Sequence, residues 1–352
     1  MSQHVEAVIV AGGFGTRLQP LTTRRPKHLL NVGGVPFLEH QIARLADAGV
    51  EHIVLATSYR AELFEPVLGD GSRWGVRLDY ALEDEPLGTA GAIRNVASAL
   101  GDDPDGAVVI LNGDILSGHD LGAQLADFER PRADRQVDVS LHLVEVPDAR
   151  PFGCVPTDGS GRVTGFTEKS ENPVTNQVNA GCYVFRRRVI DEIPPGRVVS
   201  VERETFPQLV AEGRLVVGYV ETAYWRDVGT PASLVAASRD LVLGTAPSPA
   251  VAQEPGEAHV AKTAEVSATA RVDGGTVVAE GAHVEGDAVV SATVVMEDAV
   301  VEPGAVVTSS VVGPRAVVGA GARLHQVTVG DDARIGNGVR LDGDRVECGA
   351  EV

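Results

Sequence analysis

The residues best suited to chemistry lie in the stretch AGGFGTRLQPLTTRRPKHLL, residues 11–30. An apolar run, Val8–Val10, leads directly into three glycines within four residues, followed by Arg17 and, ten residues later, Lys27. A glycine-rich turn after a buried strand lets backbone N–H groups approach a phosphate chain closely. An arginine binds phosphate oxygens as a fork and a lysine binds them as a point charge. The residues expected to contact the phosphates are Ala11, Gly12, Gly13, Gly15, Thr16 and Arg17.

This glycine pattern matches neither of the two commoner phosphate-binding fingerprints. The Walker loop requires Lys-Ser or Lys-Thr after its last glycine, but Thr16-Arg17 follows Gly15. The dinucleotide fingerprint requires a third glycine where this chain has Leu18. The glycines alone are weak evidence, because many strand-to-helix turns contain them. Together with Arg17 and Pro26-Lys27 they favour a phosphate site over a purely structural turn.

Composition limits the classes of function and partner. The chain has 352 residues, a net charge of −19 and 43% apolar residues, which predicts two domains with a large core. Its acidic surface argues against nucleic acid and anionic membranes as partners, so local cations must bind an anionic substrate. Cys154, Cys182 and Cys348 lack metal-ligand spacing and indicate reduced, mostly buried thiols of a cytoplasmic protein. We find no signal peptide pattern and no long apolar run.

Short apolar segments alternate with amphipathic ones through the first half of the chain. The strands that we predict are 5–10, 52–56, 76–82 and 107–111, and the helices are 36–49, 61–68, 89–100 with Thr89 as its cap, and a last one from Thr230-Pro231 to about Gly244. This alternation predicts an α/β fold with a mostly parallel sheet and helices on both faces. Ligands bind such sheets at the carboxyl ends of strands, so the glycine loop and Asn112–Asp114 can share one site.

The C-terminal part of the chain is repetitive. Residues 244–258 are rich in proline, glycine and alanine and are interpreted as a linker. Beyond it, Ala-x-Val/Leu/Ile triplets recur with a period of seventeen residues, as at Ala282, Ala299 and Ala316. Three short strands per period predict a parallel β-helix. The predicted domains are 1–243, a linker 244–258, and 259–352.

With these residues established, the stretch 11–30 resembles the signature loop AGG-x-GTRL-x-PLT…PK of sugar-1-phosphate nucleotidylyltransferases. His28 departs from it, because many members carry a second proline there. The resemblance implies a Rossmann-like nucleotidyltransferase domain and an enzyme that releases pyrophosphate, with Arg17 and Lys27 among its catalytic residues. The repeats resemble the left-handed β-helix of hexapeptide-repeat proteins.

Two aspartates are candidate metal ligands. Asp114 follows a strand end beside the phosphate loop, where a carboxylate suits Mg²⁺, although Asn-Gly-Asp also favours a simple turn. For Asp227, the local sequence by itself favours a simpler role as the cap of the last helix. The resemblance implies that both are catalytic Mg²⁺ ligands, since they match the NGD and W-x-D-x-GT motifs of the family, and it places Asn112 in the nucleotide site.

The acidic segment EDEPLGTAGA, which contains Glu83 and Gly88, is a candidate base-reading loop. A carboxylate only accepts hydrogen bonds, and guanine offers adjacent N1–H and N2–H donors. Gly88 permits close approach of the backbone to a ligand. The alternative interpretation of Glu83 is a solvated acidic turn. Such segments resemble the guanylyl-transferring branch of the family, and Glu83 lies where the thymidylyl-transferring branch has a base-reading glutamine.

Further motifs belong to the sugar side of the family's site. The segment FTEK matches F-x-EK, and NAGCY matches NAG-x-Y, although Ser170 replaces the usual proline after the first motif. Alone, a Glu-Lys pair is usually a solvated pair. The resemblance implies that the sugar phosphate and the sugar are bound by Gly153, Glu168, Lys169, Asn179 and Glu202.

The expected reaction joins a nucleoside triphosphate, best GTP, to a sugar 1-phosphate, best mannose 1-phosphate, with Mg²⁺. Another hexose, a cyclitol phosphate or a different nucleotide stays open. Other classes are a hexapeptide-repeat acyltransferase using His283 or His325, and a non-catalytic sugar-nucleotide sensor. A sensor need not retain metal ligands, which argues against it. The β-helix is expected to mediate homo-oligomers.

Overall fold

The computed structural model describes residues 5–83, 85–167, 171–251 and 254–352. The chain divides into two compact units. The first comprises residues 1–12 and 41–225, and the second comprises residues 13–40 and 226–352. From Gly13 onward, the predicted phosphate loop thus belongs to the same unit as the C-terminal repeats. The domain limits at residues 243 and 259 stay a prediction.

The first unit contains a twisted sheet with the strand order β10-β8-β9-β6-β1-β4-β5. Its strands are β1 Glu6–Ala11, β4 His52–Thr57, β5 Arg77–Leu82, β6 Ala107–Asn112, β8 Val139–Glu145, β9 Gln177–Arg186 and β10 Val216–Glu221. Within the described sheet only β9 runs antiparallel to its neighbours. The predicted α/β fold with a mostly parallel sheet is therefore confirmed. The short strand β7, Ile115–Ser117, follows β6.

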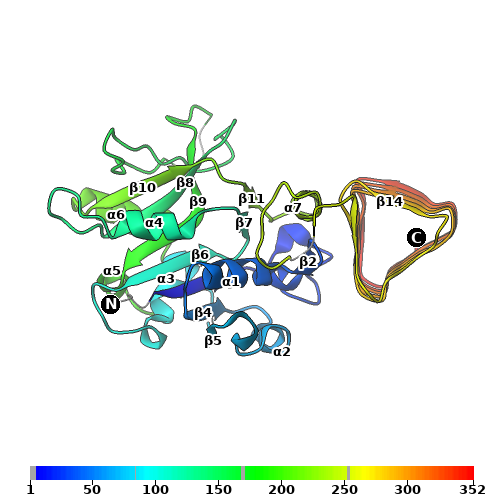
Figure 1. The fold of residues 1–352 in the computed structure, drawn as a ribbon, viewed down its shortest axis with the longest axis horizontal. Helices are drawn as coiled ribbons and strands as arrows, with labels where there is room; N and C mark the ends of the chain where they lie inside the picture. Colours follow the sequence, from blue (N-terminus) through cyan, green and yellow to red (C-terminus); the bar gives the residue numbers. More distant parts are fainter. Residues whose placement is uncertain (1–4, 84, 168–170, 252–253) are drawn as a thin grey trace. The chain divides into compact units, whose positions relative to one another are not determined.

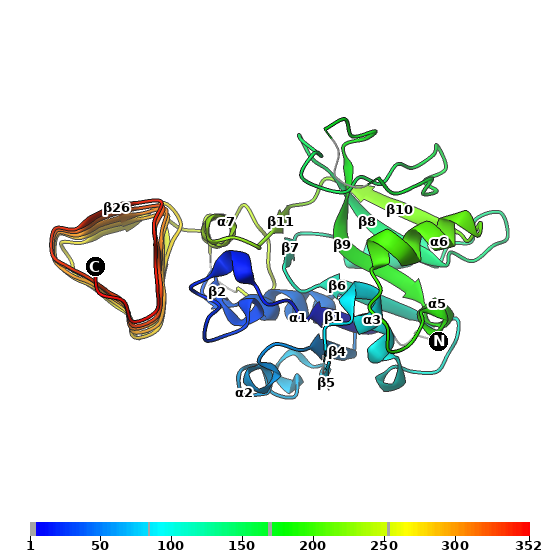
Figure 2. The same ribbon diagram turned by 180° about the vertical axis from the view of Figure 1, so that it is seen from behind.

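Helices cover both faces of this sheet. Figure 1 shows α4 in front of the sheet, and Figure 2, seen from behind, shows α6 in front of it. The α-helices of the described chain are α1 Phe37–Asp47, α2 Phe64–Leu68, α3 Gly88–Asn95, α4 Leu121–Phe128, α5 Arg187–Glu192, α6 Phe206–Ala211 and α7 Pro231–Val242. None of them combines the length and apolar character that a membrane crossing requires.

One helix start differs from the sequence prediction. Thr89 was expected to cap the third helix, but α3 begins at Gly88 and Leu87 is its N-cap. The Thr89 hydroxyl instead donates to Glu202 at 3.3 Å and accepts from the Val201 N–H at 2.9 Å. A partner far along the chain thus takes the hydroxyl that a local rule assigns to the helix.

The register of the sheet aligns the carboxyl ends of four strands. Ala11 pairs with Thr57, Thr57 pairs with Leu82, and Val10 pairs with Asn112. The residues that follow these strands therefore lie along one edge. This edge is the position where parallel sheets bind ligands.

The second unit contains the loop that follows β1, the hairpin β2 Asn31–Val32 and β3 Val35–Pro36, helix α7 and a parallel β-helix. Figure 1 looks along the axis of the β-helix and shows its three flat faces. One sheet holds β12 Ala258–Val260, β15 Thr276–Val278, β18 Val294–Val295, β21 Val311–Val312, β24 Thr328–Val329 and β27 Arg345–Val346. The second holds β13 Glu265–Val266, β16 His283–Val284, β19 Val300–Val301, β22 Val317–Val318 and β25 Arg334–Ile335. The third holds β14 Arg271–Asp273, β17 Val289–Ser291, β20 Val306–Thr308, β23 Arg323–His325 and β26 Arg340–Asp342.

The repeat explains this architecture. Val294 pairs with Val311 and Val311 pairs with Thr328, so each of these coils takes the seventeen residues that the sequence predicts. Alanines and valines of the repeat fill the interior, because only small and branched side chains fit in the space that the three sheets enclose. The predicted left-handed β-helix of hexapeptide repeats agrees with these stacked parallel sheets.

Candidate active site

The carboxyl edge of the sheet in the first unit brings Glu83 beside Gly12. Glu83 follows β5, and its backbone N–H donates to Thr57 O at 2.8 Å. A Cβ on Gly12 would lie 3.0 Å from Ser58 Oγ and 3.5 Å from Glu83 Oε2. The Ser58 hydroxyl donates to Gly12 O at 2.6 Å and so orients the first peptide of the phosphate loop. A predicted base-reading carboxylate and the start of the predicted phosphate loop are thus neighbours.

Glu83 is buried, which excludes its interpretation as a solvated acidic turn. Its residue exposure is 6%. Burial raises the pKa of the Glu83 carboxyl, and a hydrogen bond from the Leu87 backbone partly opposes that rise. Its Oε1 atom is buried and has no hydrogen-bond partner among the described residues. A buried acceptor of this kind is costly unless a ligand satisfies it.

The turn that carries Asp114 is fixed by hydrogen bonds from Gln41, a residue that the sequence analysis did not single out. The Gln41 amide of α1 donates to Asn112 O at 2.8 Å and to Ile115 O at 3.0 Å. The Gly113 N–H donates to Val10 O at 3.0 Å. These bonds fix both ends of the Asn-Gly-Asp turn against β1 and leave Asp114 half-buried at the edge of the sheet.

The buried phenol of Tyr183 joins the predicted nucleotide and sugar residues into one network. It accepts from Asn179 Nδ2 at 2.8 Å and from Asn112 Nδ2 at 3.4 Å, and it donates to Glu202 Oε1 at 3.4 Å. Burial, reinforced by the charge of Glu202, holds the pKa of Tyr183 well above its usual value. The phenol therefore stays protonated as the donor to Glu202. Tyr183 is the tyrosine of NAG-x-Y, and that motif was the signal that could have identified it.

Two glycines of this region are required by close backbone approach. A Cβ on Gly181, whose φ is +75°, would lie 2.9 Å from Ile115 Cγ1. A Cβ on Gly88, whose φ is +71°, would lie 2.7 Å from Val199 O. Gly88 thus has a packing role, and its contact with a nucleotide stays a prediction.

The sugar-side motifs are described in part. Gly153 precedes a β-bridge in which Cys154 and Thr167 exchange hydrogen bonds of 2.9 and 3.0 Å. Glu202 lies in a π-helical turn, Val201–Thr205, and accepts from the Ser200 hydroxyl at 2.9 Å. Glu168 and Lys169 lie outside the described residues. Asn179 and Glu202 therefore share the Tyr183 network, whereas the place of the predicted phosphate-binding lysine stays a prediction.

From Gly13 onward, the phosphate loop lies in the second unit. Gly15 has a φ of +65° and precedes a 3-10 turn, Thr16–Leu18. A Cβ there would lie 3.0 Å from both Lys27 Cβ and Thr22 Cγ2, so only glycine fits. The Thr22 hydroxyl donates to Gly15 O at 2.9 Å and closes the loop. A Cβ on Gly13 would lie 3.6 Å from Lys27 Nζ, so the ammonium runs alongside the glycines.

Arg17 and Asp227 approach each other within the second unit. Arg17 Nη2 lies 4.0 Å from Asp227 Oδ2, and about two thirds of the Arg17 side chain is exposed. A Cβ on Gly229 would lie 2.7 Å from Asp227 Oδ1 and would also overlap the Arg17 guanidinium. Asp227 does not cap the last helix, because Thr230 forms a capping box with Ser233 at the start of α7. The interpretation of Asp227 as a helix cap is therefore wrong.

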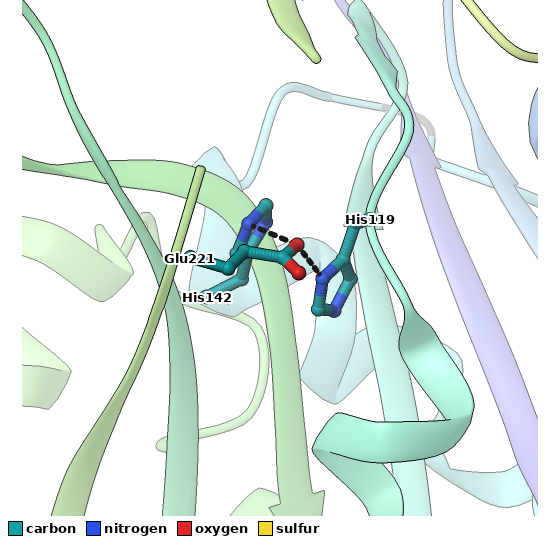
Figure 3. Close-up of side chains that lie close together, drawn as sticks. All are labelled: His119, His142 and Glu221. Carbon is teal, nitrogen blue, oxygen red and sulfur yellow. Dashed lines mark hydrogen bonds and ion pairs between the residues drawn. The ribbon is translucent and has the colours of Figure 1, made fainter. Parts of the chain in front are cut away.

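Sequence reasoning missed a buried cluster of His119, His142 and Glu221 in the first unit. Figure 3 shows one Glu221 oxygen between both rings; it contacts His119 Nδ1 and lies 3.0 Å from His142 Nε2. The rings stack with centroids 3.9 Å apart. His119 Nε2 contacts Gln124 Oε1 at 2.6 Å. Both His119 nitrogens thus face acceptors, as a charged imidazolium requires.

The charges of this cluster follow from its contacts. Burial opposes a charge on His119, but hydrogen bonds with Cys182 and Glu221 outweigh it and raise the pKa of His119 to about 10. Burial lowers the pKa of His142 to about 4. Burial also disfavours the Glu221 carboxylate, but hydrogen bonds from both histidines bring its pKa well below the usual range. The three side chains could hold a metal ion, yet one imidazolium already balances the carboxylate, so we assign the cluster a structural role.

We expect the two histidines of this cluster to contribute most to the free energy of unfolding near pH 6.5. His142 binds a proton in the unfolded chain below pH 6.5 but stays neutral when folded down to about pH 4, so stability falls on acidification. His119 keeps its proton to about pH 10 when folded, so its contribution is full below pH 6.5 and declines as the pH rises. Urea unfolding at several pH values should show a loss of about 2–3 kcal/mol from His119 between pH 7 and 9.

The matched variants for this experiment are His119→Gln and His283→Gln. His119→Gln should flatten the alkaline decline, whereas His283→Gln, at a half-exposed ring in the β-helix, should leave it unchanged. An unchanged alkaline decline in His119→Gln would contradict the assignment of the charge to that ring.

The candidate site is thus described in two parts. The first unit unites Gly12 with Glu83, and Asn112 with Asn179 and Glu202 through Tyr183. The second unit unites Gly13 and Gly15 with Lys27, and Arg17 with Asp227. Asp114 and Asp227 belong to different units, so their shared metal site stays a prediction.

Comparison with known proteins adds independent information. Residues 6–242 match the model of the nucleotidyl transferase family, and residues 255–351 match the model described as the GMPPB C-terminal domain. A mannose-1-phosphate guanylyltransferase of Mycobacterium tuberculosis is 53% identical over 286 residues, which cover 81% of this chain and 78% of that protein. A mannose-1-phosphate guanyltransferase of Yarrowia lipolytica is 37% identical, covering 64% of this chain and 61% of that protein.

Solved structures are similar as well. HddC from Yersinia pseudotuberculosis, complexed with GMP-PN, has 28% sequence identity and a TM-score of 0.56, covering 66% of this chain and 97% of that chain. A putative glucose-1-phosphate thymidylyltransferase from Bacillus anthracis has a TM-score of 0.58 at 24% identity, covering 66% of this chain and 93% of that chain, and supports the fold alone.

Proposed function

Because this chain belongs to the nucleotidyl transferase family and is an enzyme of that class, we propose that it transfers GMP from GTP to mannose 1-phosphate and releases pyrophosphate. The observation that carries the choice of base is the buried carboxylate of Glu83 beside Gly12. An acceptor at this position suits the paired donors of guanine. The 53% identity to a protein named mannose-1-phosphate guanylyltransferase supports the choice of sugar.

The reaction that we propose is an in-line displacement. An oxygen of the sugar phosphate attacks the α-phosphorus of the triphosphate, a new P–O bond forms, and the bond to pyrophosphate breaks. The second pKa of a phosphate monoester is about 6, so the nucleophile is largely dianionic at neutral pH and needs no protein base. Catalysis then consists of positioning and charge neutralisation.

Each side chain has a role in this scheme. Arg17 and the N–H groups of the glycine loop bind the triphosphate, and Lys27 stabilises charge at the α-phosphorus. Lys169 binds the phosphate of the nucleophile. Asn179 and Glu202, oriented by the Tyr183 phenol, bind hydroxyls of the sugar.

Asp114 and Asp227 are the residues that would hold Mg²⁺. Both fit a hard cation, because each offers carboxylate oxygens and is partly exposed at the end of a strand. The absence of a side chain at Gly229 lets the Arg17 guanidinium lie beside the Asp227 carboxylate. Bound Mg²⁺ would neutralise the phosphate oxygens as the leaving group departs.

The direct test is a matrix of four nucleoside triphosphates against several sugar 1-phosphates, with pyrophosphate release as the readout. GTP with mannose 1-phosphate should give the highest kcat/KM. A higher kcat/KM with another hexose 1-phosphate or a cyclitol phosphate would show that mannose 1-phosphate is not the preferred substrate, but the proposed reaction type would stand. No pyrophosphate release with any pair would contradict the proposal.

Glu83→Gln should change the base preference. An amide offers a donor beside an acceptor, which suits thymine or uracil better than guanine, so we expect kcat/KM for GTP to fall about 10- to 100-fold relative to that for UTP or dTTP. Glu85→Gln is the matched control, because Glu85 is exposed in the same segment. A GTP preference that survives in Glu83→Gln would mean that another group reads the base.

Assembly and location complete the proposal. We propose that the β-helix mediates a homo-oligomer, because stacked coils of this kind present regular faces to a second copy. A monomeric mass in solution would contradict it. The three free cysteines support a cytoplasmic location. We also retain 1–243, 244–258 and 259–352 as the proposed limits of catalytic domain, linker and β-helix domain.

A further inference from the structure

A strand of the β-helix, β27, binds the backbone of the phosphate loop. Arg345, in β27, donates from Nη2 to Arg17 O at 3.0 Å and from Nη1 to Gln19 O at 2.9 Å. These two carbonyls lie on either side of Leu18, which is itself buried. One planar guanidinium thus fixes two peptides of the loop, as its fork geometry allows.

A column of side chains at one corner of the β-helix extends this contact. Glu297, Asp331 and Cys348 occupy equivalent positions of the seventeen-residue repeat. They meet successive parts of the loop segment: Glu297 Oε1 accepts from Asn31 Nδ2 at 3.2 Å, Asp331 pairs with Arg25, and Cys348 Sγ contacts Pro20 O at 3.5 Å. We call these three residues the corner column.

The central pair of the corner column is buried. The Asp331 side chain is 1% exposed and that of Arg25 is 22% exposed. Next to this pair, Asp332 binds both Arg24 and Arg315. Removing one partner of a buried ion pair leaves an uncompensated charge, which is strongly destabilising. Equivalent positions of the repeat hold Glu297, Pro314 and Cys348, so the repeat itself does not require an acid at position 331.

We propose that the last coils of the β-helix are a positioning element of the active site. Arg345 and the corner column hold the triphosphate loop, and with it Arg17, in the conformation that binds the triphosphate. This inference rests on the role proposed above for Arg17. The β-helix then acts on catalysis within one chain, and anything that displaces its last coils lowers turnover.

The geometry explains why turnover should depend on these contacts. Arg17 lies 4.0 Å from Asp227 through a long and largely exposed side chain, so its position depends on its backbone. That backbone is held on one side by the glycine turn and on the other by Arg345. Small displacements of a charged group at a reacting centre cost much of the rate.

The test compares Arg345→Ala with Arg340→Ala in the full-length chain. Arg340 is also exposed and lies in the preceding strand, β26, in a different sheet. We expect Arg345→Ala to raise amide hydrogen exchange in residues 16–30 and to lower kcat/KM for GTP about tenfold, with KM for mannose 1-phosphate unchanged. Arg345→Lys should show only part of the increase in hydrogen exchange and only part of the loss of kcat/KM. Arg340→Ala should match the wild type in both measurements.

A second pair of variants keeps the test independent of Arg345. Arg25→Ala leaves Asp331 buried without its arginine and should increase loop exchange, and Arg25→Ala with Asp331→Asn should recover part of the wild-type protection. Loop exchange equal to that of the wild type in Arg345→Ala and Arg25→Ala would overturn the inference. Faster loop exchange with unchanged GTP kinetics would also overturn the inference, because turnover would not depend on these contacts. The role of the loop itself is tested separately, by Lys27→Ala.

Discussion

Lys27→Ala should lower kcat on the order of 10²- to 10³-fold, the effect of removing a preorganised donor at a developing charge. The Lys27 ammonium runs alongside Gly13, where backbone N–H groups are expected to meet the triphosphate. Charge on the α-phosphorus increases in the transition state, so the loss should fall on kcat more than on KM for GTP. Single-turnover pyrophosphate release measures this directly.

Two control variants accompany Lys27→Ala: one removes a different lysine, and the other replaces Lys27 with arginine. Lys262→Ala, at an exposed position of the β-helix, should have wild-type turnover. Lys27→Arg should recover activity only in part, because a planar fork does not replace a compact point charge. The melting temperature of Lys27→Ala should stay close to that of the wild type. Near-normal pyrophosphate release by a folded Lys27→Ala protein would refute the role.

The second large effect is expected for Asp114→Asn. This nearly isosteric change removes one negative charge from the turn that Gln41 holds in place, so the fold should survive. We expect kcat to fall on the order of 10²- to 10³-fold at a Mg²⁺ concentration that saturates the wild type. The Mg²⁺ concentration required for half-maximal rate should rise, because a carboxylate ligand has been lost.

Metal binding separates this role from a structural one. Calorimetric titration of Mg²⁺ into the complex with GTP should show weaker binding for Asp114→Asn and for Asp227→Asn. Asp102→Asn, at an exposed aspartate of a surface loop, should bind as the wild type does. An unchanged Mg²⁺ affinity in Asp114→Asn, with only a lower rate, would assign Asp114 to the turn and not to the metal.

Several features could be predicted from local sequence because local physics decides them. The strands that surround Gly12 and Asn112 are short apolar runs bounded by turns, and they formed where the pattern placed them. The cap of α7 at Thr230 follows from a hydroxyl before a proline at the helix start. The seventeen-residue coils follow from the spacing of alanines.

Other features depend on partners far apart in the chain. Tyr183 meets Asn112 across 71 residues and Glu202 across 19, and no local pattern indicates that one phenol joins them. Glu83 is acidic in an acidic segment, which predicts exposure, but the adjacent strand ends bury it. His142 lies in an apolar strand and acquires its shifted pKa from burial beside His119.

By itself, then, the sequence determined which elements form and the repeat that builds the β-helix, because propensity, turn chemistry and periodicity act over a few residues. The motif that carries the phosphate chemistry stays a prediction from the sequence. Tertiary structure alone decided which of those motifs share a network, and that the corner bearing Asp331 faces Arg25 of the loop. A repeat makes every corner of a coil equivalent until packing selects one of them. That selection depends on contacts hundreds of residues apart in the chain, which a linear pattern does not record.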